Sequence, residues 1–140
     1  MRVPVNIRRF GRRSARPKLP FAVTPGLRVA QVTASNPFER VEAFPVERWH
    51  ELDTYKPRLL IGSAADLHQL RERVKQNSLS LTSIDYAVFV LTVCGERPMS
   101  DVSRVALWQS FGVPVYELFV GKGGTVPGFR MRISGRVAYN

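Results

Sequence analysis

The feature that most constrains the fold is a nearly uninterrupted apolar run, YAVFVLTVC, at Tyr86 to Cys94 within the longer segment IDYAVFVLTVCG. The segment is rich in β-branched and aromatic residues, which favour strands. A strand without polar alternation is typical of one buried on both faces, as in a parallel sheet. The run is far shorter than the roughly 18 apolar residues that indicate a membrane-spanning helix. We therefore expect a buried strand and no membrane association.

A helical segment precedes this run. RLLIG, at 58–62, is a short apolar stretch that ends on glycine and predicts a strand. Leu67, Leu70 and Val74 then recur at spacings of three and four, which places them on one helical face. Ser63 stands where a helix N-cap is expected. The pattern predicts a helix near 64–76.

A second helix and a third strand follow the apolar run. Ser100 is a residue type that caps helix N-termini, and Gly112 is typical of the position just past a helix end. VPVYELFVG, after Gly112, predicts a strand. The order is therefore β-α-β-α-β, and crossover helices of this length join parallel strands. We predict parallel strands near 58–62, 85–93 and 113–120, with helices near 64–76 and 101–111.

The predicted fold class is α/β: a small three-layer, Rossmann-like β-α-β-α-β parallel half-sheet with a disordered basic N-terminal arm. We divide the chain into a disordered basic arm at 1–20, an irregular segment with short strands and a helix at 21–56, the α/β core at 57–121, and a C-terminal tail or hairpin at 122–140. Within 21–56, FAVTPG and LRVAQV predict short strands around a turn at Pro25–Gly26, and NPFERVEAF predicts a helix capped at Asn36. ERWHELDTY predicts one or two further helical turns. The C-terminal hairpin is expected to turn at Ser134–Gly135.

The net charge of +10 is concentrated at the two ends. Residues 1–18 hold seven basic residues and no acid, and residues 122–140 hold four basic residues and no acid. The central body, which carries all eleven acids, is almost neutral. The arm could contact phosphate backbones through basic residues that lie close together in the sequence: Arg8, Arg9, Arg12, Arg13 and Arg16.

Cysteine usage excludes two classes of site. Cys94 is the single cysteine, so no disulfide framework and no multi-cysteine metal site can form. We predict no metal site, no catalytic residues and no resident cofactor. The missing cysteine pair and the absence of a secretory signal fit a cytoplasmic protein.

A family resemblance becomes visible over about residues 55–121. YKPRLLIGSAADLHQL, VCGERPMS and SFGVPVYELFVG resemble, in order and spacing, segments of the adenylate-forming (AMP-binding) enzymes, in their phenylacetate–coenzyme A ligase branch. The resemblance implies that Gly95 and Glu96 match the Gly-Glu of the nucleotide-side loop. It also implies a nucleotide-binding role for Gly95, Glu96 and Tyr116, with ATP and magnesium as the cofactors that the family uses.

The departures from the family pattern concern catalysis. The family's strand ends in Tyr-Gly-x-Thr-Glu, whereas this chain has YELFVGKGG. Residues 1–55 contain no Ser/Thr/Gly-rich phosphate loop, and there is no room for the family's C-terminal domain with its lysine. Adenylation needs charge stabilisation around the transferring phosphoryl group. We therefore expect a degenerate or partial domain with a non-catalytic role in binding or assembly; any activity would be of the acid–CoA ligase type.

Two other interpretations stay open. The chain could be a basic-tailed, nucleic-acid-associated protein whose neutral body is a scaffold for the arm. It could also be a fragment or a misread frame, because the family pattern ends after Gly121. Under the leading interpretation, the partner is a second copy or another chain that pairs with a sheet edge; an anionic partner of the arm is the alternative.

Overall fold

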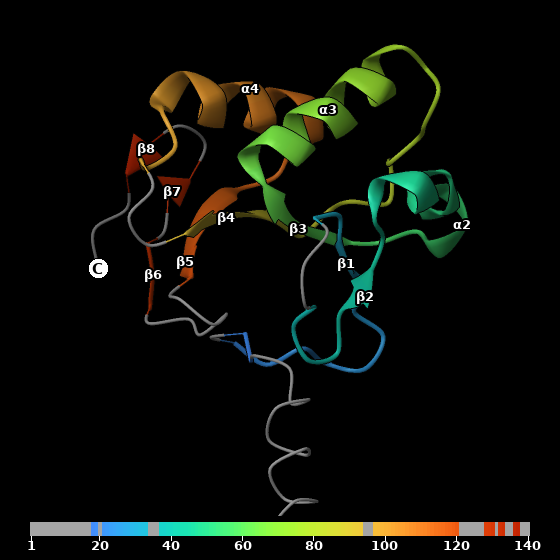
Figure 1. Cartoon of the computed structure of the whole chain (residues 1–140), viewed down its shortest axis with the longest axis horizontal. Coiled ribbons are helices and arrows are strands. Elements are labelled where there is room, and N and C mark those ends of the chain that lie inside the picture. Colours follow the sequence, from blue (N-terminus) through green and yellow to red (C-terminus); the bar gives the residue numbers. More distant parts are fainter. Residues whose placement is uncertain are drawn as a thin grey trace, which may run out of the picture.

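The structure is a computed structural model that describes residues 18–19, 21–33, 37–93, 97–120, 128–130, 132–133 and 136–137. Its centre is a six-stranded sheet in the order β2-β1-β3-β4-β5-β6 (Figure 1). The strands are β1 (Val29–Gln31), β2 (Glu42–Ala43), β3 (Leu59–Ser63), β4 (Ala87–Val93), β5 (Val115–Val120) and β6 (Gly128–Arg130). The first five are parallel, and β6 pairs antiparallel with β5.

The predicted β-α-β-α-β core is confirmed. Helix α3 (Ala64–Lys75) joins β3 to β4, and helix α4 (Asp101–Phe111) joins β4 to β5. Both predicted caps form: Ser63 Oγ accepts from the Asp66 N–H, and Ser100 Oγ accepts from the Ser103 N–H. Gly112 ends α4 with φ 71°, a left-handed conformation that favours glycine. These elements confirm the predicted Rossmann-like α/β fold class.

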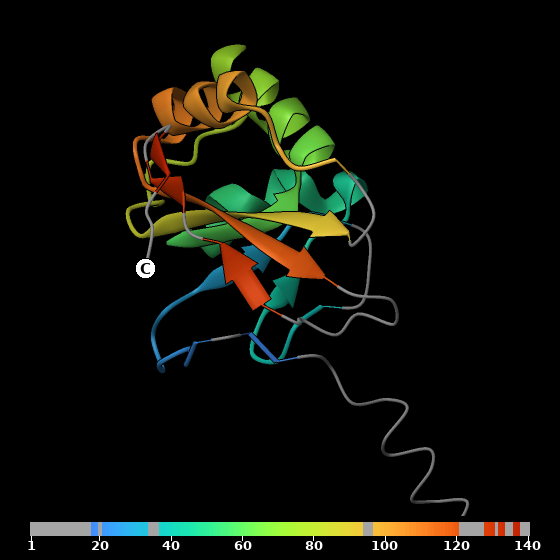
Figure 2. The same ribbon diagram turned by 90° about the vertical axis from the view of Figure 1, so that its left-hand side faces the viewer.

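The handedness of the crossovers places all the helices on one face of the sheet. The chain moves from β1 to β2 in one direction and from β2 through β3 and β4 to β5 in the opposite direction. Because parallel crossovers are right-handed, this reversal sends the β1–β2 connection to one face and the later connections to the other. Figure 2 shows α3 and α4 together on one side of the sheet.

Two apolar clusters fill the two faces. The helix-side cluster includes Leu60, Leu67, Val88 and Leu107, and the opposite cluster includes Ile61 and Phe89. On that second face the described covering layer is irregular chain with turns, at 18–19, 21–28 and 37–41, rather than helix. The predicted third layer is therefore present but, over the described residues, irregular rather than helical.

The segment 21–56 corrects two predictions. The turn at Pro25–Gly26 is confirmed, with the Leu27 N–H donating to Thr24 O at 3.1 Å, but FAVTPG is not a strand. LRVAQV contains β1, as predicted. The helix predicted from Asn36 is wrong: Asn36 lies outside the described residues, and the chain after Pro37 turns and enters β2.

Burial explains the second error. Phe38 and Val41 are buried on the open face of the sheet, whereas Phe44 is buried on the helix side. An extended strand presents residues to both faces, so it buries this set and one helical stripe cannot. The predicted helical turns in ERWHELDTY are confirmed as a 3-10 helix, η1 (Val46–Glu51), and a short helix, α2 (Leu52–Tyr55).

Both outer edges of the parallel strands have local partners. Strand β6 covers the edge of β5. At the other edge, the Arg48 guanidinium donates to Ala43 O at 3.3 Å and is ion-paired with Glu51. A partner that added a strand at β2 would have to displace Arg48.

The C-terminal segment contains the predicted hairpin. Strands β7 (Arg132–Ile133) and β8 (Arg136–Val137) pair antiparallel, and the predicted turn residues between them lie outside the described residues. Across the described part of the chain, no helix has both the length and the apolar character needed to cross a membrane.

Candidate functional site

The carboxyl edge of the sheet is the first place to look for a ligand site. In open α/β sheets, ligands bind beyond the carboxyl ends of the parallel strands, preferentially where the strand order reverses. Here the reversal lies between β1 and β3. Residues 34–36, 94–96 and 121–127, which follow β1, β4 and β5, lie outside the described residues. The described part of this edge consists of the switch point and the start of α4.

The polar groups at the switch point bond to one another. The Ser63 N–H donates to Thr33 Oγ1 at 2.6 Å, and the buried Gln31 side chain accepts from the Phe38 N–H at 3.3 Å. Gly62 allows this close packing, because a Cβ at that position would lie 2.7 Å from Val32 Cγ2. These groups hold the start of α3 against β1.

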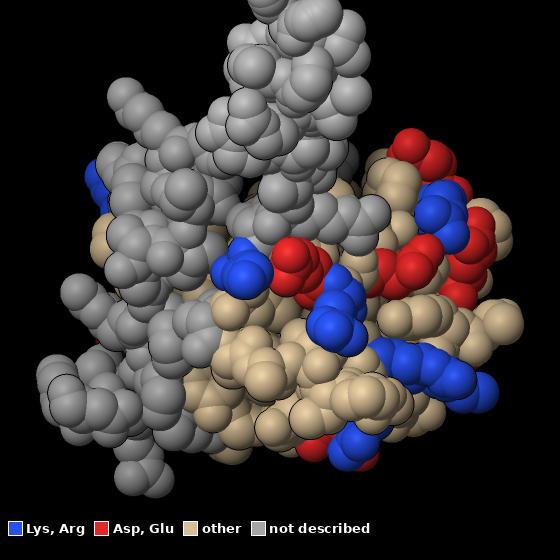
Figure 3. Space-filling view, turned by 90° about the horizontal axis from the view of Figure 1, so that it is seen from below, with Lys and Arg blue, Asp and Glu red and all other residues tan. Residues whose placement is uncertain are grey.

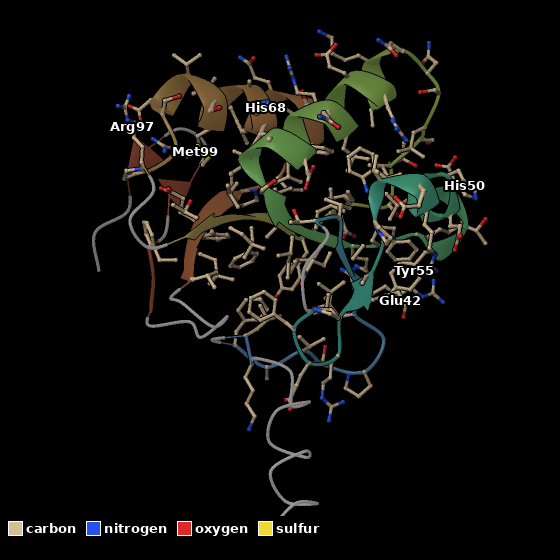
Figure 4. The ribbon with its side chains drawn as sticks, viewed as in Figure 1. Glu42, His50, Tyr55, His68, Arg97 and Met99 are labelled. Atoms are coloured by element: carbon tan, nitrogen blue, oxygen red, sulfur yellow. The ribbon has the colours of Figure 1, made fainter. Side chains whose placement is uncertain are left out.

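The start of α4 contains a different kind of cluster. The Glu117 side chain, fully buried on β5, accepts from the Met99 N–H at 2.9 Å and from the Thr92 hydroxyl at 3.2 Å. Arg104, on the first turn of α4, is also fully buried. We call Thr92, Met99, Arg104 and Glu117 the α4 cluster. Figure 4 shows Met99 and Arg97 together at the end of α4 where the helix begins.

Arg104 is the most unusual member of the α4 cluster. One of its terminal nitrogens, Nη2, contacts Asp101 Oδ1, whereas Nε and Nη1 have no hydrogen-bond partner in the described part of the chain. Burial of a charged group is costly unless the charge is paired and its donors are satisfied. The rest of the helix–sheet interface is built from apolar residues such as Leu107 and Val115. Two buried charges in such surroundings point to a site rather than to packing.

Two polar contacts join the outer helices. His68 Nε2 lies 2.7 Å from Ser103 Oγ, and the Arg71 Nε–H donates to Ser110 Oγ at 2.7 Å. Partial burial, followed by the nearby Arg71 charge, lowers the pKa of His68 below its ordinary value. A serine nucleophile needs its histidine to be oriented by a third group. No carboxylate of the described residues bonds to His68, so the pair is a contact between helices.

The structure separates the residues that the resemblance brings together. Tyr116 is the second residue of β5 and stacks on Phe89 at 5.0 Å between ring centroids, on the face opposite the helices. Its register partner Phe89 lies four residues before the end of β4, about 13 Å along the strand. Tyr116 is therefore a packing residue away from the carboxyl edge. Gly95 and Glu96 lie outside the described residues.

The basic arm residues Arg8, Arg9, Arg12, Arg13 and Arg16 also lie outside the described residues. The described surface opposite the helices carries both signs of charge interspersed (Figure 3). Over the described residues, no three His, Cys, Asp or Glu side chains come together as a metal site.

The sequence prediction missed Arg104 and Glu117, although both left a signal. Glu117 is the one acid inside the apolar strand VYELFV, and Arg104 lies three residues before Leu107 on the apolar face of α4. A charge at a position that the pattern buries is informative. No family model matches this sequence, and no curated protein matches it. The resemblance to adenylate-forming enzymes thus depends on the quoted residues alone.

Proposed function

We propose that this chain is a non-catalytic binding domain, a degenerate or partial relative of the adenylate-forming enzymes, that holds a ligand beside the start of α4. The observation that carries the proposal is the α4 cluster. The Glu117 side chain, buried at the middle of β5, accepts from the Thr92 hydroxyl near the end of β4 and from the Met99 N–H just before α4, and Arg104 is buried on the first turn of α4. Thr92 and the start of α4 lie at the carboxyl end of β4, the edge where α/β sheets hold ligands. In the sequence, the Gly-Glu pair of the resemblance comes between the end of β4 and the residues just before α4.

A binding role agrees with the chemistry of the chain better than a catalytic one does. Adenylation requires groups that stabilise charge on the transferring phosphoryl group. The Thr-Glu pair and phosphate loop of the family have no counterpart in the sequence. Tyr116 packs against Phe89 and not toward the α4 cluster. We also favour ligand binding over assembly through the β2 edge, because Arg48 already donates to Ala43 O there.

The test combines a binding map with an activity assay. AMP, adenosine, ATP with magnesium, and coenzyme A are titrated separately into the 15N-labelled full chain. We expect at least one of them to shift the amide signals of Thr92, Met99 and Val102, while signals of η1, at the far edge of the sheet, stay fixed. If none of these compounds shifts the α4 signals, the proposed function is wrong.

The activity assay uses ATP, magnesium and a panel of carboxylic acids, with pyrophosphate release as the readout. We expect release at the level of the enzyme-free background. Acid-dependent release that disappears in Glu96→Ala would show that the domain is a ligase and would contradict the non-catalytic role.

A second candidate function is nucleic-acid association through the arm, which the charge separation favours. Residues 1–18 carry seven basic residues and no acid, whereas the body is close to neutral. Five arginines that each neutralise one phosphate would give a slope of log affinity against log salt near −4 on duplex DNA, at roughly −0.9 per contact. The measurement compares the full chain with a truncation lacking residues 1–18, at two salt concentrations. Equal affinity of the two proteins for a short duplex would show that residues 1–18 do not contribute to nucleic-acid binding.

A further inference from the structure

The buried guanidinium of Arg104 indicates what kind of ligand the α4 cluster takes. Arg104 is fully buried, yet its Nε and Nη1 atoms have no hydrogen-bond partner among the described residues. An arginine presents five N–H donors in a planar fork that matches the two oxygens of a carboxylate or phosphate. Within the described residues, the guanidinium is ion-paired with Asp101 Oδ1 through Nη2. Most of the fork is available to a second acceptor.

The side chain of Arg104 extends toward the N-terminal end of α4. Helical side chains lean toward the N-terminus of their helix, and Asp101, one turn earlier, is the first residue of α4. The N-terminal end of a helix carries partial positive charge and N–H groups without partners inside the helix. A buried cation is therefore placed where the helix already favours an anion.

We propose that the ligand of this site presents an oxyanion, a phosphate or a carboxylate group, that binds the Arg104 fork at the first turn of α4. The inference depends on the proposed binding role and adds the chemical class of the ligand. The anion lies on the Asp101 side of the guanidinium, because buried Glu117 is held on the sheet side by Met99 N–H and the Thr92 hydroxyl. Glu117 positions the residue just before the cap of α4.

Asp101 is an internal competitor for the same guanidinium. Its side chain is 76% exposed, so its contact with Arg104 can open toward solvent. An incoming oxyanion replaces one carboxylate oxygen by another acceptor of the same charge. Removal of the Asp101 charge should therefore strengthen anion binding, whereas loss of the Arg104 fork should abolish it. A merely structural ion pair would not produce these opposite effects.

The probe is inorganic phosphate, titrated into the 15N-labelled full chain at constant ionic strength. We expect saturable shifts of the Arg104 Nε–H signal and of the Val102 and Ser103 amides. Charge-assisted hydrogen bonds change affinity by roughly tenfold or more each. Arg104→Gln should thus weaken binding at least tenfold, and Asp101→Asn should strengthen it several-fold. Acetate in place of phosphate tests whether a carboxylate is also accepted.

Matched controls remove equal charges on α3. Lys75→Gln and Glu72→Gln alter exposed residues and should leave the phosphate affinity within twofold of the parent protein. If Arg104→Gln does not fold, Arg104→Lys keeps the charge but loses the fork, and should still bind at least several-fold more weakly. Unchanged affinity in both Arg104→Lys and Asp101→Asn overturns the inference.

The outcome separates this inference from the proposed function. If adenosine or another uncharged probe shifts the α4 signals while phosphate and acetate do not, the site binds ligands but not through an anion, and only the inference fails. If phosphate shifts only signals of residues 1–18, the anion binds the arm and the inference is also wrong. If phosphate shifts the α4 signals, and the Arg104 and Asp101 variants change its affinity in the directions given above, the result supports both the proposed function and the inference.

Discussion

Replacement of Gly62 by alanine is the sharpest structural test of how the carboxyl edge is built. Gly62 lies near the end of β3, on the side that faces α3. A Cβ at this position would lie 2.7 Å from Val32 Cγ2, 3.1 Å from Thr33 Oγ1 and 3.3 Å from Leu67 Cγ. The first distance is too short for two carbon atoms, so Val32 or the start of α3 must move.

The expected cost follows from overpacking of a filled core. Val32 and Leu67 are both buried, at 1% and 0% exposure, so neither has solvent to move into. Extra methyl groups in a tight core cost about 1–3 kcal/mol. Alanine also restricts the unfolded chain more than glycine does, and this effect stabilises the folded state by about 0.4–1 kcal/mol. We expect a net loss of about 1–2 kcal/mol in the free energy of unfolding, or roughly 3–8 °C in Tm for a chain of this size.

A double-mutant cycle identifies the cause. Val32→Ala removes the Cγ2 atom that the new Cβ would meet, so the two substitutions should be less costly together than their sum by about 1 kcal/mol. The assay is urea unfolding followed by circular dichroism for the parent, the two single variants and the double variant. Additive costs, or a Gly62→Ala variant as stable as the parent, would refute the packing argument.

The remaining predictions concern the helix caps and one histidine. Ser63→Ala and Ser100→Ala each remove a side-chain cap and should lower the free energy of unfolding by about 1 kcal/mol, whereas exposed Ser80→Ala should change it little; equal effects in thermal melts would contradict the role of the caps. Burial and the Arg71 charge lower the pKa of His68 from 6.5, so the folded chain takes up this proton less readily than the unfolded chain. The contribution of His68 is therefore full above pH 6.5 and is lost as pH falls toward the lower folded-state pKa. Urea unfolding at pH 5 and pH 8 should show a weaker pH dependence for His68→Gln than for the parent, and identical dependences would show that His68 does not contribute.

The local signals of the core were sufficient to predict its elements. The apolar run of β4, the caps Ser63 and Ser100, and the terminating Gly112 act over a few residues, so they specify strands and helices without knowledge of the rest of the chain. Parallel pairing also followed, since helical crossovers of this length return the chain in the same direction. The sequence by itself therefore determined the α/β class and the order of elements from β3 to β5.

Only the tertiary structure decided how the first half of the chain is used. The segment after Asn36 carries a helix-start pattern, yet it becomes β2 because Val41 and Phe44 are buried on opposite faces of the sheet. The position of β1 between β2 and β3 depends on apolar surfaces that meet over long separations, and no local pattern encodes it. The positions of the candidate site residues also depend on tertiary packing rather than on a local pattern. Tyr116 matches a motif of the resemblance but packs on the face opposite the helices. Arg104 and Glu117 belong to no recognised motif and are separated in the sequence, yet both are buried near the start of α4, where the helix packs on two strands. A side chain's neighbours are set by the packing of whole elements, which the sequence specifies only through the sum of all its contacts.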